Sequence, residues 1–245
     1  MGASLQYSGG RAVVGLIDPR GPSRLALRTQ RANGSFGPLR VFLRVSEELD
    51  FFTRSAEYND VQIAPDGRGG QVAALERGSR PNRYLQLVHK PRGRAARTIA
   101  RQRDEADNYN FSPLSVSPDG WTALAYRRAP VITSLNSSIH VLVVSPRGRI
   151  RSTRLTGLGD FYGPAASVTR GGAGAAGFAG TALAPGFRSA ASFLPLSAGL
   201  PLPAGALLRG VGEAVIGNIV MTSNPRDRAR VVWEEGKRVL PSRLE

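Results

Sequence analysis

A pair of turn motifs that occurs twice in the same order is the feature that most constrains the fold of this chain. Pro65-Asp66-Gly67 is followed 26 residues later by Pro91-Arg-Gly-Arg94, and Pro118-Asp119-Gly120 is followed 28 residues later by Pro146-Arg-Gly-Arg149. Proline, aspartate and glycine favour tight turns because Pro presets φ, Asp caps its own backbone and Gly accepts positive φ. The matched order and spacing predict a repeated unit of strands joined by tight turns.

Residues 111–154 contain one complete copy of this unit. Apolar and polar residues alternate on both sides of Pro118-Asp119-Gly120, which predicts a hairpin. The β-branched run Ile139–Val144 is typical of a buried strand, and the alternation after Gly148 indicates a half-exposed outer strand. The unit therefore consists of four expected strands, at 113–117, 121–126, 139–144 and 149–155. Such an up-and-down sheet is one blade of a β-propeller.

Glycines that stand directly before small, apolar strands extend the repeat along the chain. They are Gly10, Gly70, Gly120, Gly172 and Gly212. Small residues in these strands would let neighbouring sheets approach closely. We predict an all-β, β-propeller-like fold of about five four-stranded antiparallel blades, with a pair of β-sandwiches as the second choice. The blades are expected at about 3–45, 60–102, 113–156, 163–203 and 205–241, in a single domain (1–245) that could be a fragment of a longer array.

The first and third units carry a resemblance to a known family of repeats. Ser117-Pro-Asp-Gly-Trp-Thr-Ala-Leu-Ala-Tyr126 resembles the core of TolB-like (PD40, WD40-like) propeller repeats. The first unit, with Gly10-Arg-Ala-Val-Val-Gly-Leu16, Leu25–Arg28 and Asn33–Pro38, is similar to repeats of uncharacterised actinobacterial propeller-like proteins. The resemblance covers about two thirds of the chain and implies the fold. It also implies binding of partners outside the cytoplasm.

Composition limits the chemistry and leaves the compartment undecided. The 245 residues are enough for one sizeable all-β domain, and the absence of cysteine excludes disulfides and thiolate metal sites. No apolar run reaches the length of a spanning helix, so we expect no membrane span. The first residues lack the pattern of a signal peptide, and we expect an extracytoplasmic location only if an upstream part of the chain has been lost.

The net charge of +15 suggests an affinity for polyanions. The arginines are dispersed rather than clustered, apart from Arg92–Arg103, which is more typical of solvated strand edges and turns. We therefore expect no specific binding to nucleic acid. The paired arginines of the two Pro-Arg-Gly-Arg turns leave a polyanion-binding rim as an alternative.

The sequence contains no catalytic motif. A Gly-x-Ser-x-Gly elbow and a phosphate-binding P-loop are both absent. We expect His89 and His140 to be packed or edge residues of their strands, and Asp66 and Asp119 to stabilise their turns. No catalytic residue, metal site or cofactor is predicted.

Acidic and aromatic residues gather in the expected connections between blades, at 44–60, 101–112 and 156–163. These segments hold half of the chain's 18 acidic residues. Rings stack on sugars, and carboxylates hydrogen-bond hydroxyls or catalyse. The candidate ligand-binding residues are Glu47, Glu48, Asp50, Phe51, Phe52, Asp104, Glu105, Asp107, Tyr109, Asp160, Phe161 and Tyr162.

These observations favour a non-enzymatic interaction or scaffold protein with a protein or carbohydrate partner bound at the acidic-aromatic connections. Two alternatives stay open. The first is a carbohydrate-active, glycosidase-like propeller that uses the same carboxylates, and the second is a polyanion-binding basic protein. A close pair of carboxylates would favour the enzyme, and an arginine stripe with salt-sensitive binding would favour the polyanion binder.

Overall fold

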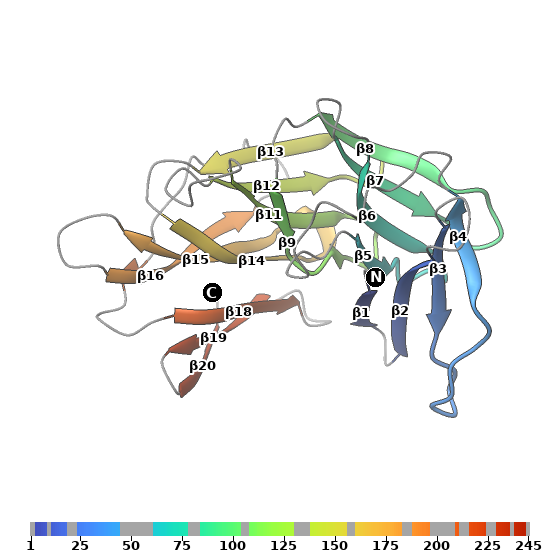
Figure 1. Ribbon diagram of the computed structural model, residues 1–245, viewed down its shortest axis with the longest axis horizontal. Coiled ribbons are helices and arrows are strands. Elements are labelled where there is room, and N and C mark those ends of the chain that lie inside the picture. The colour runs from blue at the N-terminus through green and yellow to red at the C-terminus, as the bar shows by residue number, and fades with distance from the viewer. Residues whose placement is uncertain are drawn as a thin grey trace. The chain divides into compact units, whose positions relative to one another are not determined.

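The chain is almost entirely β-strand in the residues that the computed structural model describes (Figure 1). These are residues 3–8, 11–18, 24–44, 61–77, 84–103, 108–129, 138–155, 160–182, 188–196, 209–210, 216–223, 229–235 and 238–243. A 3₁₀ turn, Arg170–Gly172, is the one helical element among them. The strands belong to two compact units, Met1–Glu105 and Ala106–Glu245.

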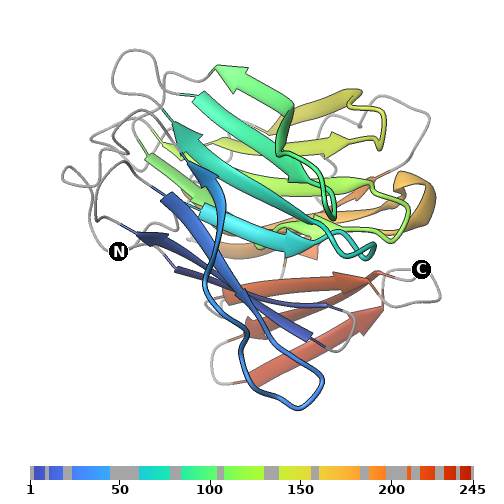
Figure 2. The same cartoon turned by 90° about the vertical axis from the view of Figure 1, so that its right-hand side faces the viewer.

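The first unit contains two antiparallel sheets of four strands each. One has the order β1-β2-β3-β4, formed by Ala3–Ser8, Arg11–Asp18, Arg24–Thr29 and Arg40–Arg44. The other has the order β5-β6-β7-β8, formed by Val61–Pro65, Gln71–Arg77, Tyr84–Lys90 and Arg97–Arg103. The connection between β3 and β4 projects beyond the ends of these strands in both views (Figure 2).

The second unit contains three further antiparallel sheets. Its first sheet joins β9 to β13, which are Asn108–Phe111, Ser115–Val116, Thr122–Ala129, Ser138–Val144 and Ile150–Leu155. The next joins β14 to β17, Asp160–Val168, Gly174–Ala182, Arg188–Leu196 and Arg209–Gly210. The last joins β18 to β20, Ile216–Ser223, Ala229–Glu235 and Arg238–Arg243. The prediction of an all-β chain with about five antiparallel sheets of sequential strands is confirmed.

One five-residue turn recurs within both units. Its first residue donates its N–H to the carbonyl of the fifth, as in Asp66 to Gly70, Ser117 to Trp121 and Thr169 to Ala173. The turns that begin at Arg31 and Ser145 close in the same way. The fourth residue is always a glycine with positive φ, namely Gly34, Gly69, Gly120, Gly148 and Gly172. Such a residue gives hairpin loops the twist that antiparallel strands need, and glycine adopts it without steric cost.

The register of this turn differs from the sequence alignment of the repeats. The matching Pro-Asp-Gly motifs predict that Asp66 and Asp119 occupy equivalent positions. In the structure Asp66 is the first residue of its turn, and its counterpart is Ser117, while Asp119 is the third residue. In these two copies a short side chain with an oxygen adds a second bond at the first position, because Asp66 Oδ1 and Ser117 Oγ each accept the N–H of the fifth residue.

The first strand of the third sheet extends further upstream than the expected 113–117. Both β9 and β10 pair with β11, and an extra residue separates the pair Phe111–Tyr126 from the pair Ser115–Ala123. Pro113 has no N–H to donate to the ladder. Ser112 compensates, because its N–H donates to Ala125 O at 2.7 Å and its Oγ accepts Ala125 N–H at 3.0 Å. The interruption is a β-bulge that keeps the strand paired on both sides.

Each unit has an apolar core that small residues of the second strand help to close. In the first unit, Ala73 of β6 packs with Val13, Leu25 and Phe42 of the neighbouring sheet. In the second, Ala123 and Ala125 of β11 pack with residues of β14 and β15, including Ala166 and Ala176. Sheets approach closely where side chains are small, which is the role predicted for these residues.

Candidate functional site

Most of the predicted acidic-aromatic residues lie outside the described part of the chain. These are Glu47, Glu48, Asp50, Phe51, Phe52, Asp104, Glu105 and Asp107. The other four are placed by their backbone. Tyr109 lies in β9 opposite Arg128, and Asp160, Phe161 and Tyr162 lie in β14 opposite Thr181, Gly180 and Ala179. The expectation that these four belong to connections between blades is wrong, because β9 and β14 begin earlier than their sequence patterns indicate.

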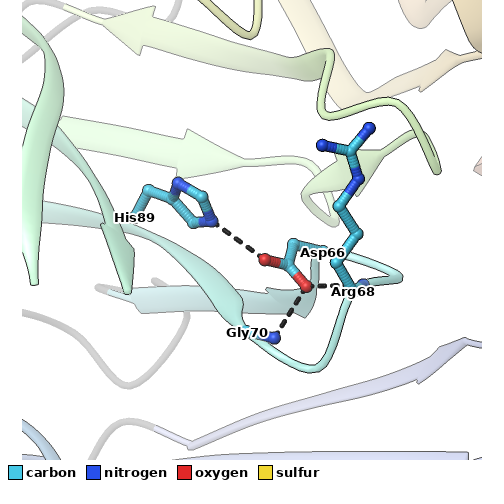
Figure 3. A network of polar contacts seen from close by, with 4 residues as sticks. All are labelled: Asp66, Arg68, Gly70 and His89. Carbon is cyan, nitrogen blue, oxygen red and sulfur yellow. Dashed lines mark hydrogen bonds and ion pairs between the residues drawn. The ribbon is translucent and has the colours of Figure 1, made fainter. Parts of the chain in front are cut away.

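The first described polar cluster joins a turn of the second sheet to its third strand (Figure 3). Asp66 Oδ1 accepts the N–H groups of Arg68 and Gly70, both at 2.8 Å. Asp66 Oδ2 accepts from His89 Nε2 at 2.9 Å. Only 7% of the Asp66 side chain and 22% of the His89 side chain are exposed to solvent. The carboxylate therefore fixes the turn 66–70 against the end of β7, and the prediction that Asp66 stabilises its turn is confirmed.

Asp119 forms a hydrogen bond that links two sheets of the second unit. Its Oδ2 accepts the N–H of Gly171 at 2.8 Å, and its Oδ1 accepts the hydroxyl of Ser117 at 2.5 Å. Burial raises the pKa of the Asp119 carboxyl, but these hydrogen bonds and the charge of Arg170 outweigh burial, so the pKa lies below its usual value. Asp119 thus fixes the turn that begins at Thr169 as well as its own.

His140 is a packed residue, as predicted. It is 7% exposed, stacks on Tyr126 with ring centroids 5.0 Å apart, and shares a hydrogen bond of 3.1 Å with Ser138. In the described part of the chain, no group of three or more His, Asp or Glu residues could hold a metal ion. The same residues include no helix long and apolar enough to cross a membrane.

A basic cavity of about 770 Å³ opens in the first unit, at the ends of its two sheets. Four of its lining residues are cationic, namely Arg31, Arg40, Lys90 and Arg92, and no described lining residue is acidic. One wall is the connection between β3 and β4. The other is formed by the turns after β5 and β7, whose glycines leave little side-chain bulk at the opening. A cavity of this size is in the range of ligand-binding sites.

The two walls of the basic cavity are held in place by hydrogen bonds. The Asp66–His89 contact joins the two turns of one wall, since Lys90 directly follows His89 and Arg92 lies two residues further along. Lys90 reaches the other wall, where Nζ donates to the carbonyls of Val41 at 3.1 Å and Phe42 at 3.3 Å. Lys90 Nζ also lies 5.7 Å from the centre of the Phe42 ring. An ammonium group has three donors, so one remains for a ligand.

Sequence reasoning identified only one of the four cations of this cavity. Arg92 belongs to a Pro-Arg-Gly-Arg turn that was predicted to be solvated, with a polyanion-binding rim as the alternative. Arg31, Arg40 and Lys90 carried no distinguishing pattern, although Lys90 is one of only two lysines in the chain. The cavity is formed by two sheets, and no local motif encodes it.

Comparison with known proteins supports the fold. No protein-family model matches the chain, and no curated protein matches it. Among solved structures, an alpha-L-arabinanase of Penicillium chrysogenum complexed with arabinobiose is 9% identical, with 98% of this chain and 77% of that one covered and a TM-score of 0.53. Puromycin hydrolase is 14% identical at a TM-score of 0.55, with 95% of this chain but only 36% of that one covered.

A third solved structure, a subtype N10 neuraminidase-like protein of a little yellow-shouldered bat isolate, is 9% identical at a TM-score of 0.50, with 98% of this chain and 92% of that one covered. The arabinanase and the neuraminidase-like protein are β-propellers. The chain therefore has a β-propeller-like fold, as the sequence predicts. At these identities the likeness defines the fold and not the activity.

Proposed function

We propose that this protein is a non-catalytic binding module that takes an anionic ligand in the basic cavity of its first unit. The observation that carries the proposal is the set of four cations around a cavity of about 770 Å³ whose described lining contains no acid. Arg31, Arg40 and Arg92 are exposed and have no ion-pair partner among the described residues. Exposed guanidinium groups that have no ion-pair partner are suited to bind the carboxylate, sulfate or phosphate groups of a ligand.

Replacing Arg92 by glutamine tests this proposal. We expect R92Q to bind fluorescein-labelled dextran sulfate about tenfold more weakly than the parent protein, because one charge-assisted contact is lost. Fluorescence anisotropy at several salt concentrations gives the affinity. The affinity should fall as salt rises, and R92Q should have the shallower salt dependence. Neutral dextran is expected not to bind.

Arg147→Gln is the matched control, because Arg147 lies in the corresponding Pro-Arg-Gly-Arg turn of the second unit and outside the cavity. Both variants lower the net charge equally. If R147Q weakens binding as much as R92Q, the attraction comes from the overall charge of the protein and the cavity is not the site.

The second candidate is a glycoside-active propeller, which the likeness to the Penicillium arabinanase favours. In this case carboxylates of the segments 45–60 and 104–107 and Asp160 would act on the sugar. We expect the protein to release reducing sugar from arabinan, and Asp50→Asn, Asp107→Asn or Asp160→Asn to lower the rate about 100-fold or more if that residue is the acid or base. A rate equal to the buffer blank would reject this candidate for arabinan.

Three further proposals follow from sequence. The acidic-aromatic residues named above form a ligand-binding face, residues 1–245 form a single propeller-like domain, and its repeats are similar to TolB-like repeats. The sheets of sequential strands support the single propeller-like domain, and the other two proposals rest on the sequence alone.

A further inference from the structure

We propose that the basic cavity binds an extended acidic peptide segment of a partner protein, in which apolar side chains stand beside the carboxylates. This inference rests on the proposed function and names the class of its ligand. Two properties of the cavity carry it, the apolar surface next to its cations and the rigidity of the wall that presents them.

The apolar surface lies at the base and along one side of the cavity. Val13, Leu27 and Phe42 line it and are at most 5% exposed, so the base is apolar. Val41 also lines the cavity and is 38% exposed, and the nearby residues Phe36 and Leu39 of the same segment are 42% and 45% exposed. Only one other large apolar side chain is exposed to this degree in the described residues, Ile150 of the second unit.

Exposed apolar residues beside cations favour a ligand that is both acidic and apolar. A sulfated or carboxylated sugar polymer is hydrophilic along its whole length, so it would neutralise the arginines and leave Val41 in water. An acidic peptide that contains leucine or phenylalanine would neutralise the arginines and would also bury the exposed apolar surface. Charge complementarity and apolar burial together therefore favour a peptide over a polysaccharide.

The wall formed by the connection between β3 and β4 is preorganised. Gln30 accepts the N–H of Ala12 at 3.2 Å and donates to the carbonyl of Gly34 at 3.0 Å. Gly37 N–H donates to Thr29 O at 3.0 Å, and the turn from Arg31 to Ser35 is closed by a hydrogen bond of 2.7 Å. A wall that is already ordered loses little conformational entropy when a peptide binds, which favours affinity.

Three fluorescein-labelled peptides of equal length test the proposal by fluorescence anisotropy. One alternates Glu with Leu, one alternates Glu with Ser, and one alternates Lys with Leu. We expect the Glu/Leu peptide to bind about tenfold more tightly than the Glu/Ser peptide, because a leucine side chain becomes buried. The Lys/Leu peptide should not bind. Val41→Ser should remove most of the advantage of Glu/Leu over Glu/Ser without changing the affinity for Glu/Ser, because Val41 is the exposed apolar residue that lines the cavity.

Ile150→Ser is the matched control, since Ile150 is also an exposed β-branched apolar residue, 45% exposed against 38% for Val41, and lies in the second unit. It should leave all affinities unchanged. Equal affinities for Glu/Leu and Glu/Ser, with R92Q still weakening both, would overturn the peptide inference and leave the anion site intact. Dextran sulfate that binds more tightly than Glu/Leu at equal charge would likewise identify a polysaccharide as the ligand.

Two other outcomes have distinct meanings. If R92Q changes no affinity for any anion, the proposed function itself fails. If the protein forms a dimer in sedimentation velocity, and Val41→Ser but not Ile150→Ser dissociates it, the apolar surface is covered by a second copy of the chain and the peptide inference is overturned.

Discussion

Gly172→Ala is expected to lower the free energy of unfolding of the second unit by about 3 kcal/mol, because steric overlap adds to backbone strain. Gly172 has a φ of +81°, and a Cβ atom there would lie 2.5 Å from the Trp121 ring. Trp121 packs against the core of the unit and under Arg151, whose guanidinium lies 5.6 Å from the ring centre. Urea unfolding followed by tryptophan fluorescence measures the effect, since both tryptophans, Trp121 and Trp233, belong to this unit.

Gly171→Ala separates the two causes of this loss. Gly171 has a similar φ of +72°, but no atom lies within 4 Å of the position its Cβ would take. Its N–H, which Asp119 accepts, is retained in alanine. We expect Gly171→Ala to cost only about 1 kcal/mol, which is the conformational part alone. Equal losses for the two variants would show that the tight approach of Gly172 to Trp121 does not contribute.

Asp66→Ala is expected to destabilise the first unit by about 3 kcal/mol, because two backbone N–H groups and a histidine lose their acceptor at a buried position. The N–H groups are those of Arg68 and Gly70, and the histidine is His89. Urea unfolding followed by circular dichroism measures the stability. Hydrogen exchange of the Arg68 and Gly70 amides should accelerate, because these are the protons that the carboxylate protects.

Two variants resolve the contributions within the Asp66 cluster. His89→Ala removes one of the three hydrogen bonds and should cost about 1 kcal/mol. Asp66→Asn keeps an oxygen that can accept both N–H groups and should cost less than Asp66→Ala. If His89→Ala is as damaging as Asp66→Ala, the turn does not depend on the carboxylate in the way the geometry indicates.

The Asp66 variants also bear on ligand binding. His89 directly precedes Lys90, and Arg92 follows two residues later, so the Asp66–His89 contact positions two cations of the basic cavity. A loosened turn should therefore weaken binding of anions even though Asp66 itself is not among the residues that line the cavity.

Local features of the fold could be predicted because short segments encode them. Strand alternation and the Pro-Gly turns located most strands of the third sheet, and the small residues of β11 were correctly expected to face a neighbouring sheet. The turn register was wrong by two residues because the alignment matched Asp66 with Asp119 by identity. Hydrogen bonding instead matches Asp66 with Ser117, whose oxygen performs the same task.

The extents of β9 and β14 were missed for a related reason. Asn108–Phe111 and Asp160–Tyr162 are polar and aromatic, and their local sequence alone indicates connections between strands. They are strands because β11 and β15 provide partners for them. Pairing between segments overrides the weak strand preference of residues such as asparagine.

The basic cavity could not be predicted at all. Its walls combine residues from 13–42 with residues from 65–93, and their proximity depends on how two sheets pack. The sequence shows dispersed arginines, and only the fold reveals which of them share a cavity. The acidic-aromatic candidates are the opposite case. They form a clear pattern in the sequence, but their role in a binding site remains a prediction.

The five-residue turn separates positions that are fixed from positions that are free. Its first residue supplies an oxygen or a closing N–H, its fourth is glycine, and its fifth is Gly70, Trp121, Arg149, Ala173 or Ser35 in the five copies. The side chain at the fifth position therefore has no part in closing the loop. A lineage could accumulate substitutions at the fifth position where it is Ser35, Arg149 or Ala173 without remaking the hairpin. Gly70 and Trp121 are closely packed, and Asp119 at a third position is bonded to Gly171. New recognition surfaces could in this way evolve on an unchanged framework.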